Sequence, residues 1–336
     1  MSAAPLSDEE MRKLLKPTCT MEQVEEAITE SFGGTVKIIR ALDSYDDQNF
    51  MAEWNGTKYL VKVHNGVESQ DFLDSYEKNG KDYTTCSSVI HFQTAIMNQL
   101  NQHEVPTSQA QLCEGIPLAI HSLPVLSDQH SPCRLVVKLL TWVPGRTMAS
   151  LPSLSIECLR DAGRLLGKTH HALDDMDASQ HSTAAQRFHA WDGKNTVQIR
   201  NFCSAIDNVK RRSMVESVIS AFEHEILDSG VGDKFRKGII QGDFNDGNIL
   251  VDDDFSISGV IDFGDSVERY VSLLLISIVL LVKLESWVRL SGVDRCASVG
   301  GFCLPLVSWT SFRRAISNAG VKHPDRQRYH GSFAFP

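Results

Sequence analysis

Three short apolar runs separated by two polar turns lie between Gly238 and Asp265, in the stretch GIIQGDFNDGNILVDDDFSISGVIDFGD. Apolar, β-branched runs of this length, bounded by Gly, Asn and Asp, are typical of short strands joined by tight loops. The first loop carries Asp243 and, five residues later, Asn248, and the third run is followed by Asp262. Since all three side chains stand at strand ends, the spacing predicts that one potential base and two oxygen ligands converge.

Phosphoryl transfer from a nucleotide requires such a set of groups. A carboxylate orients the attacking hydroxyl and accepts its proton, and amide and carboxylate oxygens are ligands that suit Mg²⁺. A cation for the phosphates is also needed, because the chain has a formal net charge of −9. Lys62 interrupts the apolar run YLVKV and projects from one side of a predicted strand, so it is the candidate. A surface lysine on a strand is the alternative.

The elements GDFNDGNIL and IDFGD resemble those of the aminoglycoside phosphotransferase and choline kinase superfamily, whose fold is similar to that of protein kinases. SYDDQNF, YLVKVHN, LLTWVPGR and the Leu151-Pro152 that follows resemble, more narrowly, the hydroxylysine kinase branch. The likeness spans Pro17 to Val267. It implies an α+β, bilobal, protein-kinase-like fold. In it, residues 1–140 form a β-rich, nucleotide-binding N-terminal lobe, residues 141–145 a hinge, and residues 146–267 a mainly helical, catalytic C-terminal lobe.

The resemblance also implies a role for each matching residue. Asp243 is expected to be the catalytic carboxylate, Asn248 and Asp262 the Mg²⁺ ligands, and Lys62 the lysine that contacts the phosphates. The implied activity is that of a phosphotransferase with an alcohol group as acceptor.

The segment Ser44 to Asn49 takes the place of a glycine-rich loop over the phosphates, so Ser44, Gln48 and Asn49 are expected at the nucleotide. This segment contains no glycine, and its backbone therefore approaches a ligand less freely. The strand Arg134 to Leu140 is expected to end at the hinge, which brings the backbone of Leu140 to the base.

Enzymes of the hydroxylysine kinase branch use GTP and phosphorylate 5-hydroxy-L-lysine, so the resemblance implies GTP (or ATP) as the donor and a small amino acid or amino alcohol as the acceptor. A cationic acceptor calls for carboxylates or aromatic faces, which makes Asp265, Trp191 and Asp192 candidate substrate residues. Structural roles for Trp191 and Asp265 are the alternatives. Two other functions stay open: a choline, ethanolamine or homoserine kinase with the same machinery, and a catalytically impaired pseudokinase that binds nucleotide.

Two positions depart from the superfamily pattern. Gln241 stands where a histidine is usual, two residues before the carboxylate. Glutamine both donates and accepts, so we expect weakened rather than abolished activity. His91, in a helix predicted over residues 89–100, stands where a glutamate usually pairs with the strand lysine. A neutral imidazole would hold Lys62 less firmly, and Glu77 and Glu104 are alternative partners.

Local signals predict the elements of the N-terminal lobe. Thr20 and Gln23 form a capping box at the start of a helix that ends at Gly33. Asn55-Gly56 predicts a tight hairpin between two strands. The polar residues 66–88 are expected to form a loop or insertion, and helices are expected in residues 195–206 and 213–227.

The likeness fades after Val267. We interpret residues 268–336 as a divergent tail, either replaced relative to the family or poorly folded, with a divergent helical tail as the alternative. Its apolar run Val271 to Val282 has twelve residues. Such a run rises about 18 Å as a helix, well short of a bilayer core of ~30 Å, so a buried helix is expected rather than a membrane span.

The charge and the cysteines restrict the partners and the compartment. The largest basic cluster is Lys210 to Arg212, so the acidic chain is not expected to bind nucleic acid in general. The eight cysteines lack CxxC and zinc spacings, which favours free thiols in a reducing compartment. Met1 to Lys16 begins with small and acidic residues, which is unlike a secretory signal. We predict a cytoplasmic protein with no nucleic-acid or membrane partner, and the oligomeric state stays open.

Overall fold

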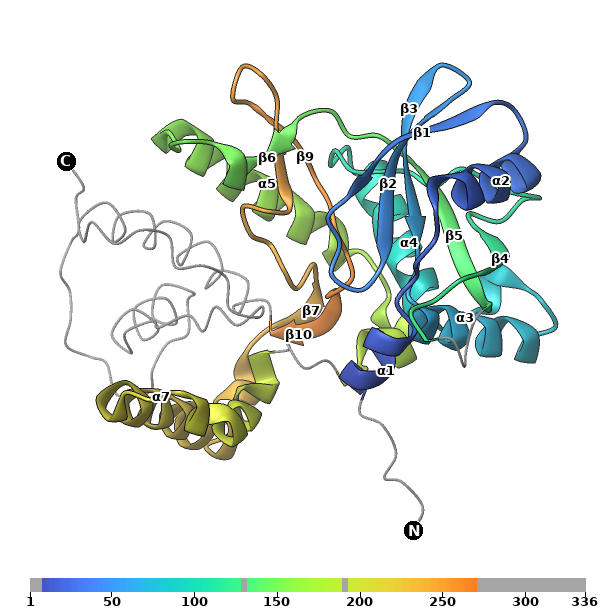
Figure 1. The fold of residues 1–336 in the computed structure, drawn as a ribbon. Helices are drawn as coiled ribbons and strands as arrows, with labels where there is room; N and C mark the ends of the chain where they lie inside the picture. The colour runs from blue at the N-terminus through green and yellow to red at the C-terminus, as the bar shows by residue number, and fades with distance from the viewer. Residues whose placement is uncertain (1–7, 128–131, 189–192, 271–336) are drawn as a thin grey trace, which may run out of the picture. The chain divides into compact units, whose positions relative to one another are not determined.

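An antiparallel five-stranded sheet dominates the first half of the chain (Figure 1). The structure, a computed structural model, describes residues 8–127, 132–188 and 193–270. The strand order is β1-β2-β3-β5-β4, and the strands are β1 (Val36–Leu42), β2 (Gln48–Trp54), β3 (Thr57–Val63), β4 (Ala119–Leu123) and β5 (Cys133–Thr141). Asn55 and Gly56 join β2 to β3 with positive φ angles of 49° and 79°, as a tight hairpin turn requires, so the hairpin prediction is confirmed.

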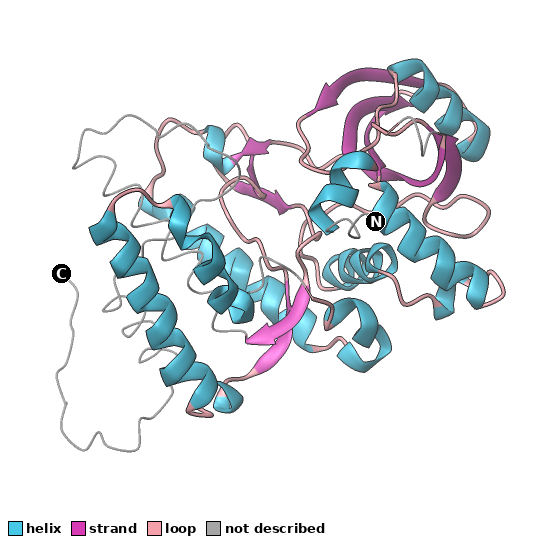
Figure 2. Cartoon of the chain, turned by 60° about the horizontal axis from the view of Figure 1, so that its bottom comes forward, coloured by secondary structure: helices cyan, strands magenta, loops and turns pink. Residues whose placement is uncertain are grey.

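Different helices cover the two faces of this sheet (Figure 2). On one face, Val24 and Ile28 of α2 (Met21–Phe32) share a buried core with Val61 of β3. On the other face, helices α3 (Gly66–Lys78) and α4 (Val89–Gln102) form a second core that includes Phe72, Ile90 and the β5 residue Val136. Alternate residues of β3 therefore point into different environments, and Lys62 lies on the α3 and α4 side.

Helices α2 and α3 each begin at a residue whose side chain caps the first turn. Thr20 accepts a hydrogen bond from the Gln23 amide and the Gln23 side chain returns one to the Thr20 amide, which confirms the capping box. The prediction of a loop over residues 66–88 is wrong for its first half, because α3 forms there. Asn65 caps α3 by accepting from the Val67 amide at 2.9 Å. The helix buries only a narrow stripe around Phe72, so its composition resembles that of a loop.

Further helices and short turns complete the described chain. The other α-helices are α1 (Asp8–Leu14), α5 (Ile156–Asp174), α6 (Ser182–Ala185) and α7 (Val209–Phe222). Gly193–Ala205 is a 3₁₀ helix, and Glu223–Asp228 continues α7 as a π-helical turn. The helices predicted in residues 195–206 and 213–227 are therefore confirmed, the first as a 3₁₀ helix and the second as α7 with its π-helical turn. Short 3₁₀ turns are Tyr83–Thr85, Met148–Ser150, Ala178–His181 and Gly232–Lys234.

The three apolar runs of the 238–265 segment form strands, as predicted. They are β7 (Lys237–Ile240), β8 (Ile249–Val251) and β9 (Ile257–Val260). β8 lies between β6 (Arg146–Thr147) and β9 in a three-stranded sheet, and β7 pairs with β10 (Val267–Tyr270). These small sheets bring the ends of β7 and β9 to neighbouring turns.

The chain divides into two compact units. One consists of Met1–Phe188 and Ile239–Glu268, and the other of His189–Gly238 and Arg269–Pro336. The predicted hinge at 141–145 lies within the first unit, and the lobe boundaries stay a prediction. In the second unit, Cys203 packs with Val215 and Ile219.

The α+β class is confirmed by the sheet and helices described above. Among the helices of residues 8–127, 132–188 and 193–270, none has the length and apolarity needed to cross a bilayer. The apolar run Val271 to Val282 and most of the tail lie outside the described residues. The six cysteines within these ranges are free thiols: Cys19, Cys86, Cys113, Cys133, Cys158 and Cys203.

Candidate active site

The loop after β7 depends on a glycine. Gly242 has a φ of +87°, a region that glycine adopts without strain. A Cβ atom on this residue would lie 2.0 Å from the backbone oxygen of Asp265. The loop that carries Asp243 can therefore pack against the turn that carries Asp265 only because position 242 has no side chain.

Asp243 is held by two amides. Asn248 Nδ2 donates to Asp243 Oδ2 at 2.8 Å and to the Asp243 backbone oxygen at 2.9 Å, and Asn245 Nδ2 donates to Asp243 Oδ1 at 2.6 Å. Burial raises the pKa of the Asp243 carboxyl to about 6, and the negative charges of Asp265 and Asp262 add to this effect. A carboxylate that is half-buried and only weakly acidic is suited to accept a proton near neutral pH.

Gln241 connects the two predicted metal-binding turns. It is fully buried, its Oε1 accepts from the Asp243 amide at 2.8 Å, and its Nε2 donates to the backbone oxygens of Ile261 (3.4 Å) and Asp262. One side chain thus donates and accepts, as expected for glutamine at this position. The effect on activity stays a prediction.

Asp262 follows β9 in a left-handed conformation, with a φ of +60°. Its Oδ1 accepts from the Gly264 amide at 3.1 Å, and the residue is otherwise exposed. The turn is fixed at its base, since the Ile261 amide donates to the backbone oxygen of Asn248 at 2.9 Å. Asn248 donates through Nδ2 to Asp243, so its Oδ1 points away from that carboxylate. An amide oxygen and an exposed carboxylate are a donor set that fits a hard divalent cation.

Lys62 belongs to the same site. Its Nζ lies 2.7 Å from Asp47 Oδ2, and the two side chains are 16% and 13% exposed. Burial opposes the charge of the ammonium group, but Asp47, Asp262 and Glu68 outweigh it and raise the pKa of Lys62. The structure therefore brings together Asp243, Asn248, Asp262 and Lys62.

Lys62 pairs with Asp47 and not with His91, Glu77 or Glu104, the partners considered from the sequence. The His91 ring instead contacts Tyr83 and His181, with centroid distances of 4.8 and 5.5 Å, and Glu77 pairs with Arg134 at 2.7 Å. Glu104 lies in the turn after α4 with a φ of 56°.

The sequence contains a signal for this partner. The Asn55-Gly56 turn sets Asn49 opposite Lys62. Asp47 lies two residues before Asn49, just ahead of β2, so an extended chain there makes it a diagonal neighbour of Lys62.

Sequence reasoning also missed Lys138. It lies opposite Lys62 on β5 and is buried, and its Nζ donates to Thr94 Oγ1 at 2.7 Å and to the Ile90 oxygen at 3.0 Å. Burial lowers its pKa to about 7, and the charge of Lys62 acts in the same direction. Lys138 therefore connects the sheet to α4. A lone lysine within the apolar run LVVKLL was the available signal.

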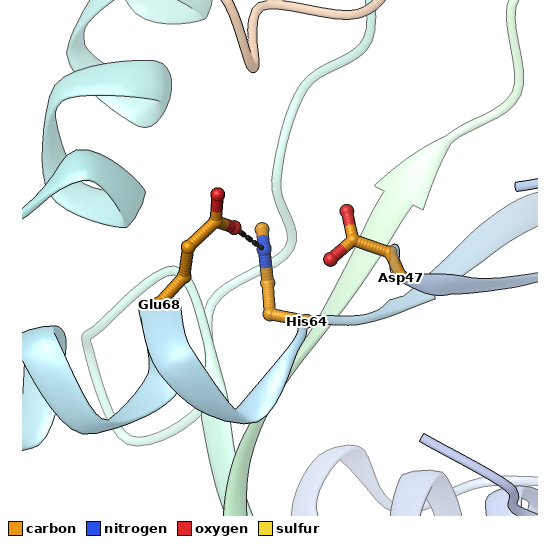
Figure 3. A group of neighbouring side chains, drawn as sticks. All are labelled: Asp47, His64 and Glu68. Carbon is orange, nitrogen blue, oxygen red and sulfur yellow. Dashed lines mark ion pairs between the residues drawn. The ribbon is translucent and has the colours of Figure 1, made fainter. Parts of the chain in front are cut away.

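The side chains of Asp47, His64 and Glu68 converge (Figure 3). Their ligand atoms all lie within 4.8 Å of one another, and their types suit a metal ion. However, Glu68 pairs with Arg12 at 3.2 Å and Asp47 pairs with Lys62. Burial lowers the pKa of the His64 ring, whose Nδ1 lies 3.6 Å from Glu68 Oε2. We therefore interpret the group as an ion-pair network.

The other predicted nucleotide residues differ in their surroundings. Asn49 shares a sheet face with Lys62, and its buried Oδ1 has no hydrogen-bond partner among the described residues. The Gln48 amide is occupied by the backbone of Cys19. Leu140 is buried and pairs with Leu60 on β3 and with Ala110.

Of the remaining predicted residues, Ser44 uses its backbone oxygen to accept from Lys16 Nζ at 3.2 Å. Asp265 lies beside Gly242 and acts electrostatically on Asp243. Trp191 and Asp192 lie outside the described residues.

These features agree with a comparison with known families. The model of the "Phosphotransferase enzyme family" matches residues 38–268, so the chain belongs to this family. It is a phosphotransferase of the small-molecule kinase type, with a hydroxyl group as acceptor.

Among characterised relatives, the chain is similar to hydroxylysine kinase of Danio rerio, with 27% identity over 281 residues, 81% of this chain and 72% of the relative. It is also similar to hydroxylysine kinase of Mus musculus, with 29% identity, 81% of this chain and 71% of the relative. A GDP complex of an aminoglycoside phosphotransferase has a TM-score of 0.49 and 15% identity, and covers 78% of each chain.

Proposed function

We propose that this protein transfers the γ-phosphate of a nucleotide, GTP, to the hydroxyl group of 5-hydroxy-L-lysine in a Mg²⁺-dependent reaction. The observation that carries the proposal is the hydrogen-bonded link between two turns, in which Asn248 holds Asp243 and Gln241 joins Asp243 to Asp262. Similarity to hydroxylysine kinases over most of the chain supports the acceptor and, through it, the donor.

Asp243 would act as the base. Its carboxylate would accept a hydrogen bond from the acceptor hydroxyl and take its proton as the new P–O bond forms, while the bond from the γ-phosphorus to the bridging β-phosphate oxygen breaks and GDP leaves. The Asn245 and Asn248 amides fix the direction of that carboxylate. Burial and nearby carboxylates keep its pKa close to neutrality, so it is both ionised and basic at pH 7.

Asn248 Oδ1 and the Asp262 carboxylate would hold the Mg²⁺ ion. When bound, such an ion would neutralise the negative charge that develops on the donor phosphates. Gln241 keeps the two ligand-bearing turns together through its three hydrogen bonds. Lys62, oriented by Asp47, would contact the donor phosphates. Asn49, on the same sheet face as Lys62, would make a further polar contact with the donor.

The acceptor's ammonium groups require anionic neighbours. Asp265 is a candidate because it lies next to the base, across the contact with Gly242. Trp191 and Asp192 stay candidates by sequence alone. The location of the protein in the cytoplasm stays a prediction too.

The proposal is tested with the purified 336-residue chain and Mg²⁺, by initial rates with hydroxylysine, ethanolamine, choline and homoserine, each with GTP and ATP. We expect hydroxylysine with GTP to have the highest kcat/KM. A higher value for another acceptor would reassign the substrate. Nucleotide binding without transfer to any acceptor would instead identify a pseudokinase.

A further inference from the structure

The chain before α2 lies along the loop that precedes β2, and it bonds to Ser44, Tyr45 and Asp46 of that loop. Lys16 Nζ donates to the backbone oxygens of Ser44 (3.2 Å) and Tyr45 (2.6 Å). Arg12 Nη1 lies 3.1 Å from Asp46 Oδ2. These contacts tie a loop without glycine to a separate stretch of chain.

The contact continues at the start of β2. The Cys19 amide donates to Gln48 Oε1 at 2.8 Å, and Gln48 Nε2 donates back to the Cys19 oxygen at 3.0 Å. This reciprocal pair fixes one strand end against a residue whose side chain belongs to the main core. Both polar atoms of the Gln48 side-chain amide are used in this pair.

The same stretch is anchored on its other side. The Thr18 amide donates to the Pro124 oxygen at 3.0 Å, the Leu126 amide to the Lys16 oxygen at 2.9 Å, and the Ser127 amide to the Leu14 oxygen at 2.9 Å. Backbone bonds of this kind resemble strand pairing and hold the stretch independently of its side chains.

Gly66, at the start of α3, allows the close approach of this stretch. The Gly66 amide donates to the Leu15 oxygen at 3.0 Å, and a Cβ atom on Gly66 would lie 2.8 Å from Leu15 Cβ. The stretch is therefore wedged between α3 and the segment after β4, with its basic side chains toward the 44–48 loop.

A chain of bonds leads from this stretch to Lys62. Asn65 Nδ2 donates to the Arg12 backbone oxygen at 2.8 Å, and the Asn65 amide donates to Asp47 Oδ1 at 2.8 Å. Asp47 Oδ2 in turn pairs with Lys62. Arg12 also pairs with Glu68 at 3.2 Å. The orientation of the phosphate lysine thus depends on residues more than forty positions earlier.

We propose that Arg12 to Cys19 form a strap that fixes the 44–48 loop over the donor phosphates, with Lys16 and Arg12 as positioning residues. Because a trans peptide directs its C=O and N–H groups to opposite sides, the bond from Lys16 to the Tyr45 oxygen turns the Asp46 amide away from the strap. In that orientation the Asp46 amide can donate to a phosphate oxygen, as backbone amides of phosphate-binding loops do. The inference rests on the proposed function for the identity of the ligand.

The test is Lys16→Ala, because this half-buried side chain can be removed without opening the core. Amide hydrogen exchange should become roughly tenfold faster at residues 44–48, since two charge-assisted bonds are lost. The KM for the nucleotide should rise several-fold while the KM for the acceptor and the unfolding temperature stay the same. Lys16→Arg should restore both, and Lys58→Ala, an exposed lysine on β3, should change neither.

Unchanged exchange at residues 44–48 in Lys16→Ala would overturn the strap, and faster exchange with an unchanged nucleotide KM would overturn its role in donor binding. The two proposals fail in different ways. A parent protein that transfers no phosphate overturns the proposed function, while the exchange rates still decide whether the strap holds the loop.

Discussion

Replacing Asp47 with asparagine removes the charge that orients Lys62 and leaves the rest of its contacts. The variant keeps an Oδ1 atom to accept from the Asn65 amide, so only the 2.7 Å pair with Lys62 is weakened. Both side chains are less than one-fifth exposed, so solvent screens the pair little. Glu68 and Asp262 remain close to Lys62 and compensate in part.

A hydrogen bond between charged, mostly buried partners contributes about 2 kcal/mol. If this free energy serves to place Lys62 on the donor, its loss lowers kcat/KM for the nucleotide by roughly 30-fold. Steady-state rates against nucleotide concentration at saturating acceptor measure this value, and thermal unfolding measures the stability change in parallel.

Glu77→Gln is the matched control. It breaks the Glu77–Arg134 pair, which has the same 2.7 Å length but side chains that are 50% and 54% exposed. Exposed pairs contribute at most about 1 kcal/mol, so we expect no kinetic change. If Asp47→Asn matches the parent and Glu77→Gln in kcat/KM, Asp47 does not position Lys62 and the reasoning is refuted.

Three further predictions concern the loop after β7. Asp243→Asn should lower kcat by roughly 10²–10⁴ while the nucleotide still binds, and rates near those of the parent would exclude Asp243 as the base. Since a pKa of about 6 leaves Asp243 mostly protonated at pH 5, kcat/KM should be about tenfold lower at pH 5 than at pH 8. Asp265→Asn removes a negative charge near Asp243 and should therefore shift this decline to lower pH. A kcat/KM that does not change with pH would contradict the assignment of Asp243 as the base. Gly242→Ala should destabilise the protein by about 3 kcal/mol or more in urea unfolding, because the new Cβ overlaps the Asp265 backbone oxygen. Gly163→Ala, in open space on α5, is the control and should be neutral or stabilising. Equal unfolding midpoints for the two variants would show that the overlap relaxes freely.

The parts of the site that sequence predicted are those set by local spacing. Asp243 and Asn248 share one loop, and Asp262 ends the next hairpin, so strand alternation and turn residues were enough to bring them together. The Asn55-Gly56 turn similarly fixed the face of Lys62. In each case the contact joins residues whose strands are adjacent in sequence.

The parts that sequence missed depend on packing between distant segments. The position of Lys138 opposite Lys62 follows only from the pairing of β5 with β3, although the lone lysine in an apolar run was visible in the sequence. Asp47 was overlooked because a helix glutamate was expected, although the hairpin register already made it a neighbour. The polar composition of α3 predicted a loop. The segment is helical instead, because burial of Phe72 in the tertiary structure outweighs that composition.

In the proposed function, Asp243 and the groups around it transfer a phosphoryl group to the hydroxyl of hydroxylysine. The most direct measurement is the mass of hydroxylysine after incubation with GTP, Mg²⁺ and either the parent protein or Asp243→Asn. We predict that the parent adds the mass of one phosphoryl group and that the variant leaves the acceptor nearly unchanged. Hydroxylysine of unaltered mass with the parent, or equal phosphorylation by both proteins, would contradict the account.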